Sequence, residues 1–412
     1  MNLGVFFIGD PRSGGLYQYS LTLLDSLKSR QDKAIVFDLS GTAFPQEKYQ
    51  GFFKTSNALR LMSFLRRTAI KVYSQPKSTR AEQVTTNVRT TSLIARQPTA
   101  ETLDVLFLKL LLKLNRIKLN IFTAPTHLSF RLKTPFIMPV HDLQHRLNPQ
   151  FPEVSAGGIW EDREYLYSNA VAKATAILVD SEISKEDVLK FYSTDEKKVK
   201  VLPYVPPNYL RGSYTEEELH KVQLKYHLPP RFLFYPANFW AHKNHKLIIE
   251  ALKYLRENHG MKVPVVFTGS RQVNYSVFDE IWGLVDKYGL IEQVHYLGYV
   301  SNEDIGSFYK LAEALVMPTF FGSTNIPYLE AFILGCPVIA VNIRGVKEQI
   351  GDAGLLVDVN SSQELTAAIL KIWSDENLRE VLRQKGYAKI KQWDFERFAA
   401  ALNRIIDEAA SA

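Results

Sequence analysis

The stretch PTFFGSTNIPYLEAFILGCPVIAVN, residues 318–342, decides the fold of this chain. A loop of turn-forming residues leads into an apolar helical segment, which ends at Gly335 before the β-branched run PVIAV. A loop, a helix and a buried strand in this order are typical of parallel α/β domains. One carboxylate, Glu330, lies in the first turn of the expected helix. Two roles fit it: complementing the helix dipole, or accepting hydrogen bonds from two hydroxyl groups of a ligand.

The same alternation of apolar strands and amphipathic helices fills most of the chain. The expected strands are residues 3–8, 33–39, 119–124, 135–140, 176–180, 231–238, 264–269, 294–300, 312–319, 337–342 and 354–358. A proline-rich segment, VLPYVPPNYLRG at 201–212, separates the first five strands from the other six and is interpreted as a hinge. We therefore predict two Rossmann-like parallel-sheet domains, residues 1–205 and 206–393, which face each other across a cleft.

The composition is that of a globular protein, with 412 residues of which 46% are hydrophobic and 23% charged. No apolar run approaches the roughly 20 residues that span a bilayer, and the N-terminal MNLGVFFIGD resembles a first strand more than a signal peptide. The single cysteine, Cys336, excludes an intramolecular disulfide and a multi-cysteine zinc site. These features predict a cytoplasmic protein.

The positive charge is concentrated in residues 51–120, which hold 13 lysines and arginines against three acids. Within them, residues 52–73 alternate bulky apolar side chains with basic ones. This pattern predicts an amphipathic helix that either lies on an anionic membrane surface or packs on the domain with a solvated basic face. No nucleic-acid-binding module accompanies the charge, so nucleic acid is not an expected partner.

Three loops besides 318–325 carry candidate site residues. Gly14 and Gly15 follow the first strand, where they either let an anion approach the start of a helix or form a plain turn. His141 and Asp142 follow the strand at 135–140; a histidine that forms hydrogen bonds in the cleft is favoured over a structural histidine and over a metal pair with His145.

Lys243 lies at the start of the helix HKLIIEALKYLREN. The helix dipole disfavours a cation at this end, so the position indicates a bound anion such as phosphate. An exposed surface lysine is the alternative, because the unfavourable interaction costs only a few tenths of a kcal/mol.

Together these motifs closely resemble family 4 glycosyltransferases of GT-B fold, in their bacterial surface-polysaccharide, mannosyltransferase-like branch. The resemblance covers nearly the whole chain through RSGGLYQY, VHDLQHR, NFWAHKNH, GYVSNEDIGSFYKLAEALVMPT and the stretch that continues to residue 358. It implies an N-terminal acceptor domain and a C-terminal nucleotide-sugar domain. QWDFERFA near the end resembles the family's last segment, which implies that residues 394–412 cross back onto the N-terminal domain.

The resemblance also implies roles for single residues. Glu330 matches the carboxylate that holds the donor ribose, Lys243 the lysine on the diphosphate, and His141 the histidine near the transferred sugar. Gly15 lies beside the diphosphate in this scheme. The remaining donor-site positions are Asn238, the base contacts Tyr299 and Val300, and the backbone of Thr324, Asn325 and Ile326.

Two positions depart from the family pattern. Asn238 replaces an arginine five positions before the lysine, and Gly322 replaces a glutamate eight positions before the ribose carboxylate. Both changes remove charge and predict an altered sugar site in a working enzyme. Because Asn238 replaces the arginine that is usual in the family, the departing diphosphate must be neutralised by Lys243, helix N-termini and loop amides.

The implied reaction moves a hexose, with GDP-mannose as the expected donor, to an acceptor hydroxyl on a saccharide linked to a polyprenyl lipid. It needs no metal or other cofactor and retains the anomeric configuration. Residues 51–120 would then hold the protein on the inner face of the cytoplasmic membrane. The alternatives are a noncatalytic nucleotide-sugar-binding regulator or partner subunit, a GT-B epimerase or phosphorylase, and a nucleic-acid-binding protein.

Overall fold

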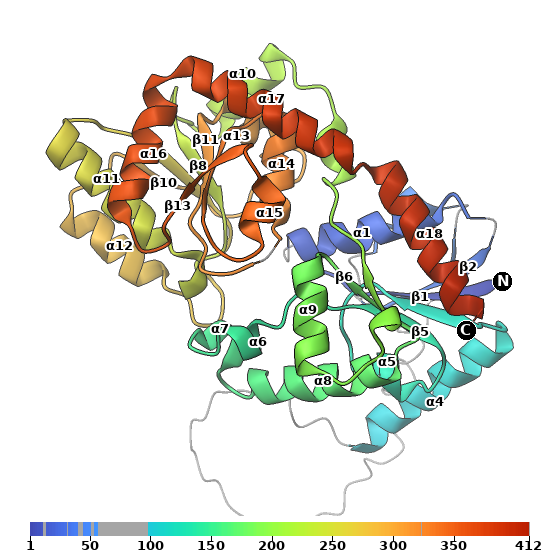
Figure 1. The fold of residues 1–412 in the computed structure, drawn as a ribbon. Coiled ribbons are helices and arrows are strands. Elements are labelled where there is room, and N and C mark those ends of the chain that lie inside the picture. Colours follow the sequence, from blue (N-terminus) through green and yellow to red (C-terminus); the bar gives the residue numbers. More distant parts are fainter. Residues whose placement is uncertain are drawn as a thin grey trace, which may run out of the picture.

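A computed structural model shows two parallel α/β domains side by side, linked by the hinge and by a pair of C-terminal helices (Figure 1). It describes residues 1–10, 14–30, 32–39, 44–50, 53–56, 98–322 and 324–411. The sequence-based prediction of two parallel-sheet domains is therefore confirmed.

The N-terminal sheet has the strand order β3-β2-β1-β4-β5-β6-β7, and every pairing in it is parallel. Its strands are β1 (Asn2–Phe7), β2 (Lys33–Asp38), β3 (Lys54–Ser56), β4 (Leu119–Phe122), β5 (Phe136–Pro139), β6 (Ala176–Val179) and β7 (Val199–Val201). Its helices are α1 (Gly15–Leu27), α2 (Gln46–Tyr49), α4 (Pro98–Leu114), α5 (Leu128–Arg131), α6 (Gln144–Leu147), α7 (Pro152–Ser155), α8 (Ile159–Lys173) and α9 (Glu182–Phe191). Side chains from α1 pack on one face of the sheet, and those of α4, α8 and α9 pack on the other.

The C-terminal sheet repeats this plan with the order β10-β9-β8-β11-β12-β13. Its strands are β8 (Leu233–Pro236), β9 (Val265–Thr268), β10 (Val294–Tyr296), β11 (Ala314–Met317), β12 (Val338–Val341) and β13 (Gly354–Val357). The helices are α10 (Glu216–Lys225), α11 (His245–His259), α12 (Phe278–Lys287), α13 (Ile305–Leu311), α14 (Ile326–Leu334), α15 (Val346–Ile350), α16 (Ser362–Ser374) and α17 (Glu376–Gln392). In each sheet the strand order reverses at one point, between β1 and β4 and between β8 and β11, and ligands bind at such points in this architecture.

All eleven predicted strands are present. Two strands, β3 and β7, were not predicted; each has only three residues and lies at an edge of the N-terminal sheet. The amphipathic-helix prediction for residues 52–73 is wrong for Lys54–Ser56, because these residues pair with β2 and extend the sheet. The rest of that segment, from residue 57 onward, lies outside the described residues.

The hinge passes from one hydrophobic core to the other. Leu202 and Val205 belong to the N-terminal core, whereas Leu210 belongs to the C-terminal core. Between these residues the chain crosses from one domain to the other, and Pro206 and Pro207 stiffen this segment. The domain boundary that we placed after residue 205 falls within this crossing.

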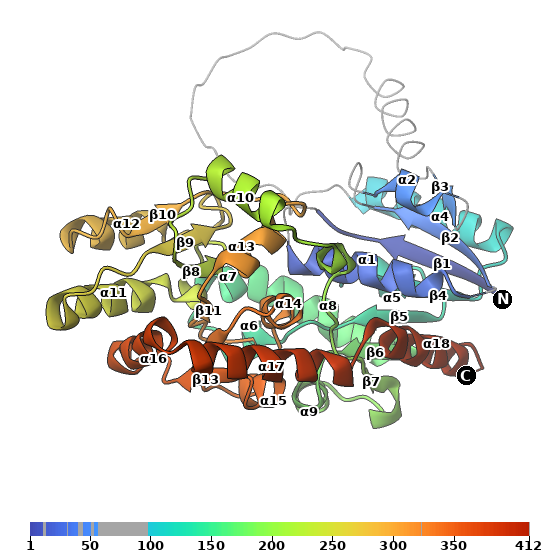
Figure 2. The same cartoon turned by 90° about the horizontal axis from the view of Figure 1, so that it is seen from above.

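The chain returns to the N-terminal domain through α18 (Phe395–Ser411), which runs on from α17 along one side of the molecule (Figure 2). Phe398, Leu402, Ile405 and Ile406 of α18 are buried in the core with residues of α1. The predicted crossing of the C-terminal helix is confirmed. Within the described parts of the chain, no helix combines the length and apolar character needed to span a bilayer.

Candidate functional site

A cavity of about 540 Å³ lies between the two domains. It takes its walls from loops that follow the carboxyl ends of β1, β5, β8, β10 and β11. The ten residues to which the family resemblance gave a role in the site all line it, namely Gly15, His141, Asn238, Lys243, Tyr299, Val300, Thr324, Asn325, Ile326 and Glu330. The structure therefore brings together residues that are far apart in the sequence, from Gly15 to Glu330.

Two helices from different domains begin at this cavity. A Cβ added at Gly15, the first residue of α1, would come within 3.1 Å of the Ile326 side chain, the first residue of α14. The free N–H groups and the positive ends of both helix dipoles therefore lie close together. Gly14 precedes α1 with φ of 58°, a left-handed value that glycine adopts readily. This arrangement suits an anionic ligand.

Lys243 provides the cation of the C-terminal wall. It ends a 3₁₀ turn, η4 (Ala241–Lys243), and Asn244 in a left-handed conformation connects this turn to α11. Burial lowers the pKa of Lys243 to about 8, and the nearby carboxylates of Asp142 and Glu153 act in the opposite direction. At neutral pH the ammonium is charged, partly buried and directed into a cavity beside two helix N-termini.

Glu330 is held by two tyrosines that the sequence analysis did not identify. Tyr309 donates a hydrogen bond to Oε2 at 2.6 Å, and Tyr209 donates one to Oε1 at 3.1 Å. Burial raises the pKa of Glu330, and these two hydrogen bonds oppose that shift. Tyr309 is fully buried on α13, whereas Tyr209 belongs to the hinge and also lines the cavity.

The expected position of Glu330 in its helix was wrong. The helix α14 begins at Ile326, with Pro327 as its second residue, so Glu330 is the fifth residue and lies beyond the first turn. Proline is favoured at helix starts, because it has no N–H group to leave unpaired there. The dipole's influence is confined to the first turn, so complementing the dipole does not account for this buried carboxylate.

His141 follows β5 and contacts aromatic side chains of its own domain. Its Nδ1 lies 2.9 Å from the hydroxyl of Tyr204, and its ring packs edge-on against Tyr19 at 5.0 Å between ring centres. Its Nε2 is buried and has no partner among the described residues. Burial lowers the pKa of His141 to about 4, so this ring is neutral at pH 7.

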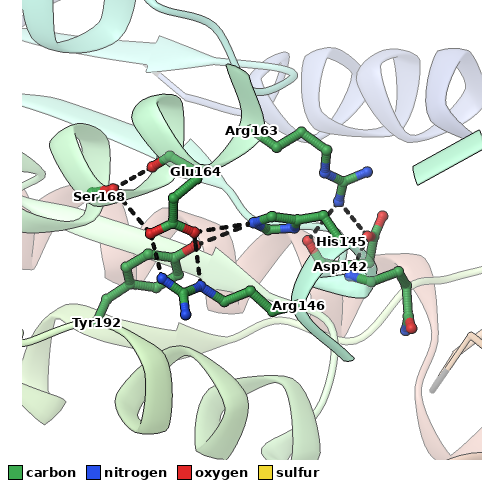
Figure 3. Close-up of polar contacts among 8 residues, drawn as sticks. Asp142, His145, Arg146, Arg163, Glu164, Ser168 and Tyr192 are labelled. Carbon is green, nitrogen blue, oxygen red and sulfur yellow. Dashed lines mark hydrogen bonds and ion pairs between the residues drawn. The ribbon is translucent and has the colours of Figure 1, made fainter. Parts of the chain in front are cut away.

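Side chains of α8 contact the loop that follows β5 (Figure 3). Arg163 donates to the backbone oxygen of Asp142 at 3.1 Å and also pairs with its carboxylate. One helical position further on, Glu164 accepts hydrogen bonds from Arg146 Nε at 2.7 Å and from the Tyr192 hydroxyl at 3.1 Å. These ion pairs join segments distant in sequence and hold the loop rigid at the edge of the cavity.

Some polar groups of the loop after β11 already form hydrogen bonds within the protein. The Asn325 N–H donates to Gln349 Oε1 at 2.8 Å, so this amide is not free to bind a ligand. The Thr324 hydroxyl donates to the buried carboxylate of Asp180, which belongs to the other domain. Asn238 also has a partner, because its Oδ1 accepts a hydrogen bond from the Ser270 N–H at 2.7 Å.

Tyr299 and Val300 follow β10 and occupy the rim of the cavity. Tyr299 is 56% exposed, whereas Val300 is buried. No cluster of three or more histidine, cysteine or carboxylate side chains with the geometry of a metal site occurs in the ranges that the structure describes. His145, the possible metal partner of His141, instead lies within 3.3 Å of Glu164.

The C-terminal domain matches a known protein family. Residues 216–389 match the family described as "Glycosyl transferases group 1". The O-antigen chain mannosyltransferase B of Escherichia coli is 28% identical over 226 residues, which are 54% of this chain and 58% of that protein. The match thus spans little more than half of that relative's length.

Solved structures resemble the whole chain. A glycosyltransferase from Rickettsia africae superposes with a TM-score of 0.72 at 16% identity, over 99% of this chain and 98% of the other. Anabaena Alr3699/HepE in complex with UDP-glucose gives 0.71 at 16% identity, over the full length of both. These matches confirm the predicted GT-B fold.

The neutral state of His141 can be tested by an NMR titration of histidine-labelled protein, with its signal assigned from a His141→Gln variant. We expect no protonation between pH 8 and about 5, because burial lowers the pKa to about 4. In the unfolded chain the pKa is near 6.5, so this histidine should reduce folding stability progressively as the pH falls from about 6.5 to 4. A measured pKa above 6 would contradict the described burial.

Proposed function

We propose that the whole protein transfers a hexose from a nucleotide diphosphate sugar to an acceptor hydroxyl, as the match of residues 216–389 to the glycosyl transferases group 1 family suggests. The observation that carries this proposal is the cavity between the domains. It combines a cation, two helix N-termini and a buried carboxylate with paired acceptor oxygens, as an anionic nucleotide requires.

Each end of the donor has a proposed partner. Glu330 accepts the ribose hydroxyls, which share or replace the hydrogen bonds from Tyr209 and Tyr309. Lys243 and the start of α14 bind the diphosphate. Tyr299 and Val300 at the rim contact the base, and the unpartnered Nε2 of His141 forms a hydrogen bond to the transferred sugar.

The proposed chemistry depends on charge. As the bond between the anomeric carbon and the phosphate oxygen breaks, negative charge grows on the leaving diphosphate. Lys243 and the helix N-termini stabilise this charge more strongly in a cavity than in water. The acceptor oxygen bonds to the same face of the anomeric carbon, and its proton passes to the leaving phosphate. The configuration is retained, and the reaction uses no metal or other cofactor.

Mannose, supplied as GDP-mannose, is the proposed sugar, because the Escherichia coli relative is an O-antigen chain mannosyltransferase. The proposed acceptor is a saccharide on a polyprenyl lipid, as the resemblance of the sequence to surface-polysaccharide glycosyltransferases implies. Such an acceptor places the enzyme in the cytoplasm, on the inner face of the cytoplasmic membrane.

A surface of the N-terminal domain supports the membrane contact. Leu106, Leu110 and Leu114 recur every four residues along α4 and are 56%, 53% and 69% exposed. Lys113 and Lys118 are exposed in the same region. Apolar side chains beside basic ones suit the interface of an anionic bilayer. The helix lies at the end of the molecule remote from the C-terminal domain (Figures 1 and 2).

The role of Lys243 is tested by Lys243→Met in a transfer assay with GDP-mannose and a lipid-linked, mannose-terminated saccharide. We expect the rate to fall by about 10²- to 10³-fold, as when one donor to a developing oxyanion is removed. The control is Lys246→Met, since Lys246 lies three residues further on, in α11, is 54% exposed and forms only a long ion pair with Glu250. An inverted anomeric product by NMR, or equal rates for the two variants, would refute the mechanism.

The membrane contact is tested by sedimentation with vesicles of phosphatidylcholine and phosphatidylglycerol at low salt. The unchanged protein should sediment, and a variant with Gln at positions 106, 110 and 114 should not, because it lacks the exposed leucines of α4. Leu224→Gln is the control, since Leu224 is 60% exposed but lies on α10 of the other domain. Failure of the unchanged protein to sediment would overturn the proposal.

A further inference from the structure

We propose that Glu153 accepts a hydrogen bond from a hydroxyl group of the transferred sugar and so helps to select the donor. This inference rests on the proposed function, because it assigns a ligand to the same cavity. Glu153 lies on α7 of the N-terminal domain, and the sequence analysis did not identify it.

The carboxylate of Glu153 has one paired oxygen and one unpaired oxygen. Its Oε1 accepts hydrogen bonds from the backbone N–H of His242 at 2.9 Å and from His242 Nδ1 at 2.6 Å. Its Oε2 is buried and has no partner among the described residues. The side chain is only 3% exposed, and Glu153 lines the cavity. A buried carboxylate oxygen without a partner is unfavourable, and a ligand hydroxyl would supply the missing hydrogen bond.

The group is ionised and therefore a strong acceptor. Burial alone would raise the pKa of Glu153, but the hydrogen bonds from His242 outweigh this effect and lower it. The ring of His242 donates as a neutral imidazole, because burial lowers the pKa of His242 to about 4. Its ring also stacks on Phe321 at 4.1 Å, which fixes the direction in which the carboxylate is held.

Glu153 lies in the part of the cavity where the sugar and the diphosphate are proposed to bind. Lys243 follows His242 directly, and the Glu153 carboxylate acts on its pKa electrostatically. Gly322, next to Phe321, also lines the cavity.

Because Gly322 replaces the glutamate of the family pattern, the loop after β11 offers the donor sugar no carboxylate at this position. Gly322 has φ of 117°, and a Cβ added there would lie 2.8 Å from Oδ1 of Asn325. The backbone therefore admits no side chain at this position without strain. Glu153, reaching across from the other domain, is the carboxylate that the structure offers to the sugar instead.

The experiment compares GDP with GDP-mannose, and UDP with UDP-glucose, by calorimetry on the full-length protein and on Glu153→Gln. The substitution keeps the size of the side chain and an oxygen for His242 but removes the charge. Affinity for the free nucleoside diphosphate should not fall, which also shows that the variant is folded. Affinity for the nucleotide sugar should fall by about 10-fold or more, as for a lost hydrogen bond to a charged group.

Asp187→Asn serves as the matched control. Asp187 forms an ion pair with Arg344 across the same two domains at 2.6 Å but does not line this cavity. If Glu153 acted only by joining the domains, the two variants would behave alike, and Glu153→Gln would weaken nucleotide and nucleotide sugar equally. That result, or no change for either ligand, overturns the inference. If the unchanged protein binds none of the four compounds, the proposed donor site is refuted, and this inference is refuted with it.

Discussion

The parallel direction of the strands is the constraint on which the rest of the structure depends. Because every strand pairing is parallel, the loops after the strands of one sheet gather at a single edge. The hinge and α18 set two such edges against each other, and the cavity is the space between them. Gly15 and Glu330 meet there although they are far apart in the sequence. A site built in this way can change shape when the domains move, because its two walls belong to different cores.

Burial in this cavity determines the charges of its side chains. It lowers the pKa of Lys243 to about 8 and that of His141 to about 4, and it raises that of Glu330. The lysine remains a cation at pH 7, while the histidine is neutral and binds by hydrogen bonding. Hydrogen bonds from two neutral tyrosine hydroxyls offset part of the effect of burial on Glu330. A phosphate group entering the cavity therefore meets a lysine that is not already paired with the ribose-binding carboxylate.

Sequence patterns predicted the strands and the two domains, because buried parallel strands form short apolar runs bounded by turn residues. They also located His141, which follows β5, and Lys243, which lies just before α11. They did not locate Glu153 or Tyr309, since each depends on a partner contributed by a distant element. The first turn of α14 was misplaced because Ile326 and Pro327 were assigned to the loop, although Asn325 and Pro327 are residue types favoured at a helix start. The edge strands β3 and β7 have only three residues, and their sequences KTS and VKV contain no run of apolar residues to mark them.

The central claim is that the cavity binds a nucleoside diphosphate through Glu330. Calorimetric titration with GDP, UDP and dTDP in the presence of EDTA tests it most directly, on the unchanged protein and on Glu330→Ala. The account predicts binding of one nucleotide, weakened by about 10- to 150-fold in the variant, since hydrogen bonds to a charged group contribute roughly 1.5–3 kcal/mol. Equal affinity for both proteins, or binding of no nucleotide by the unchanged protein, would contradict it.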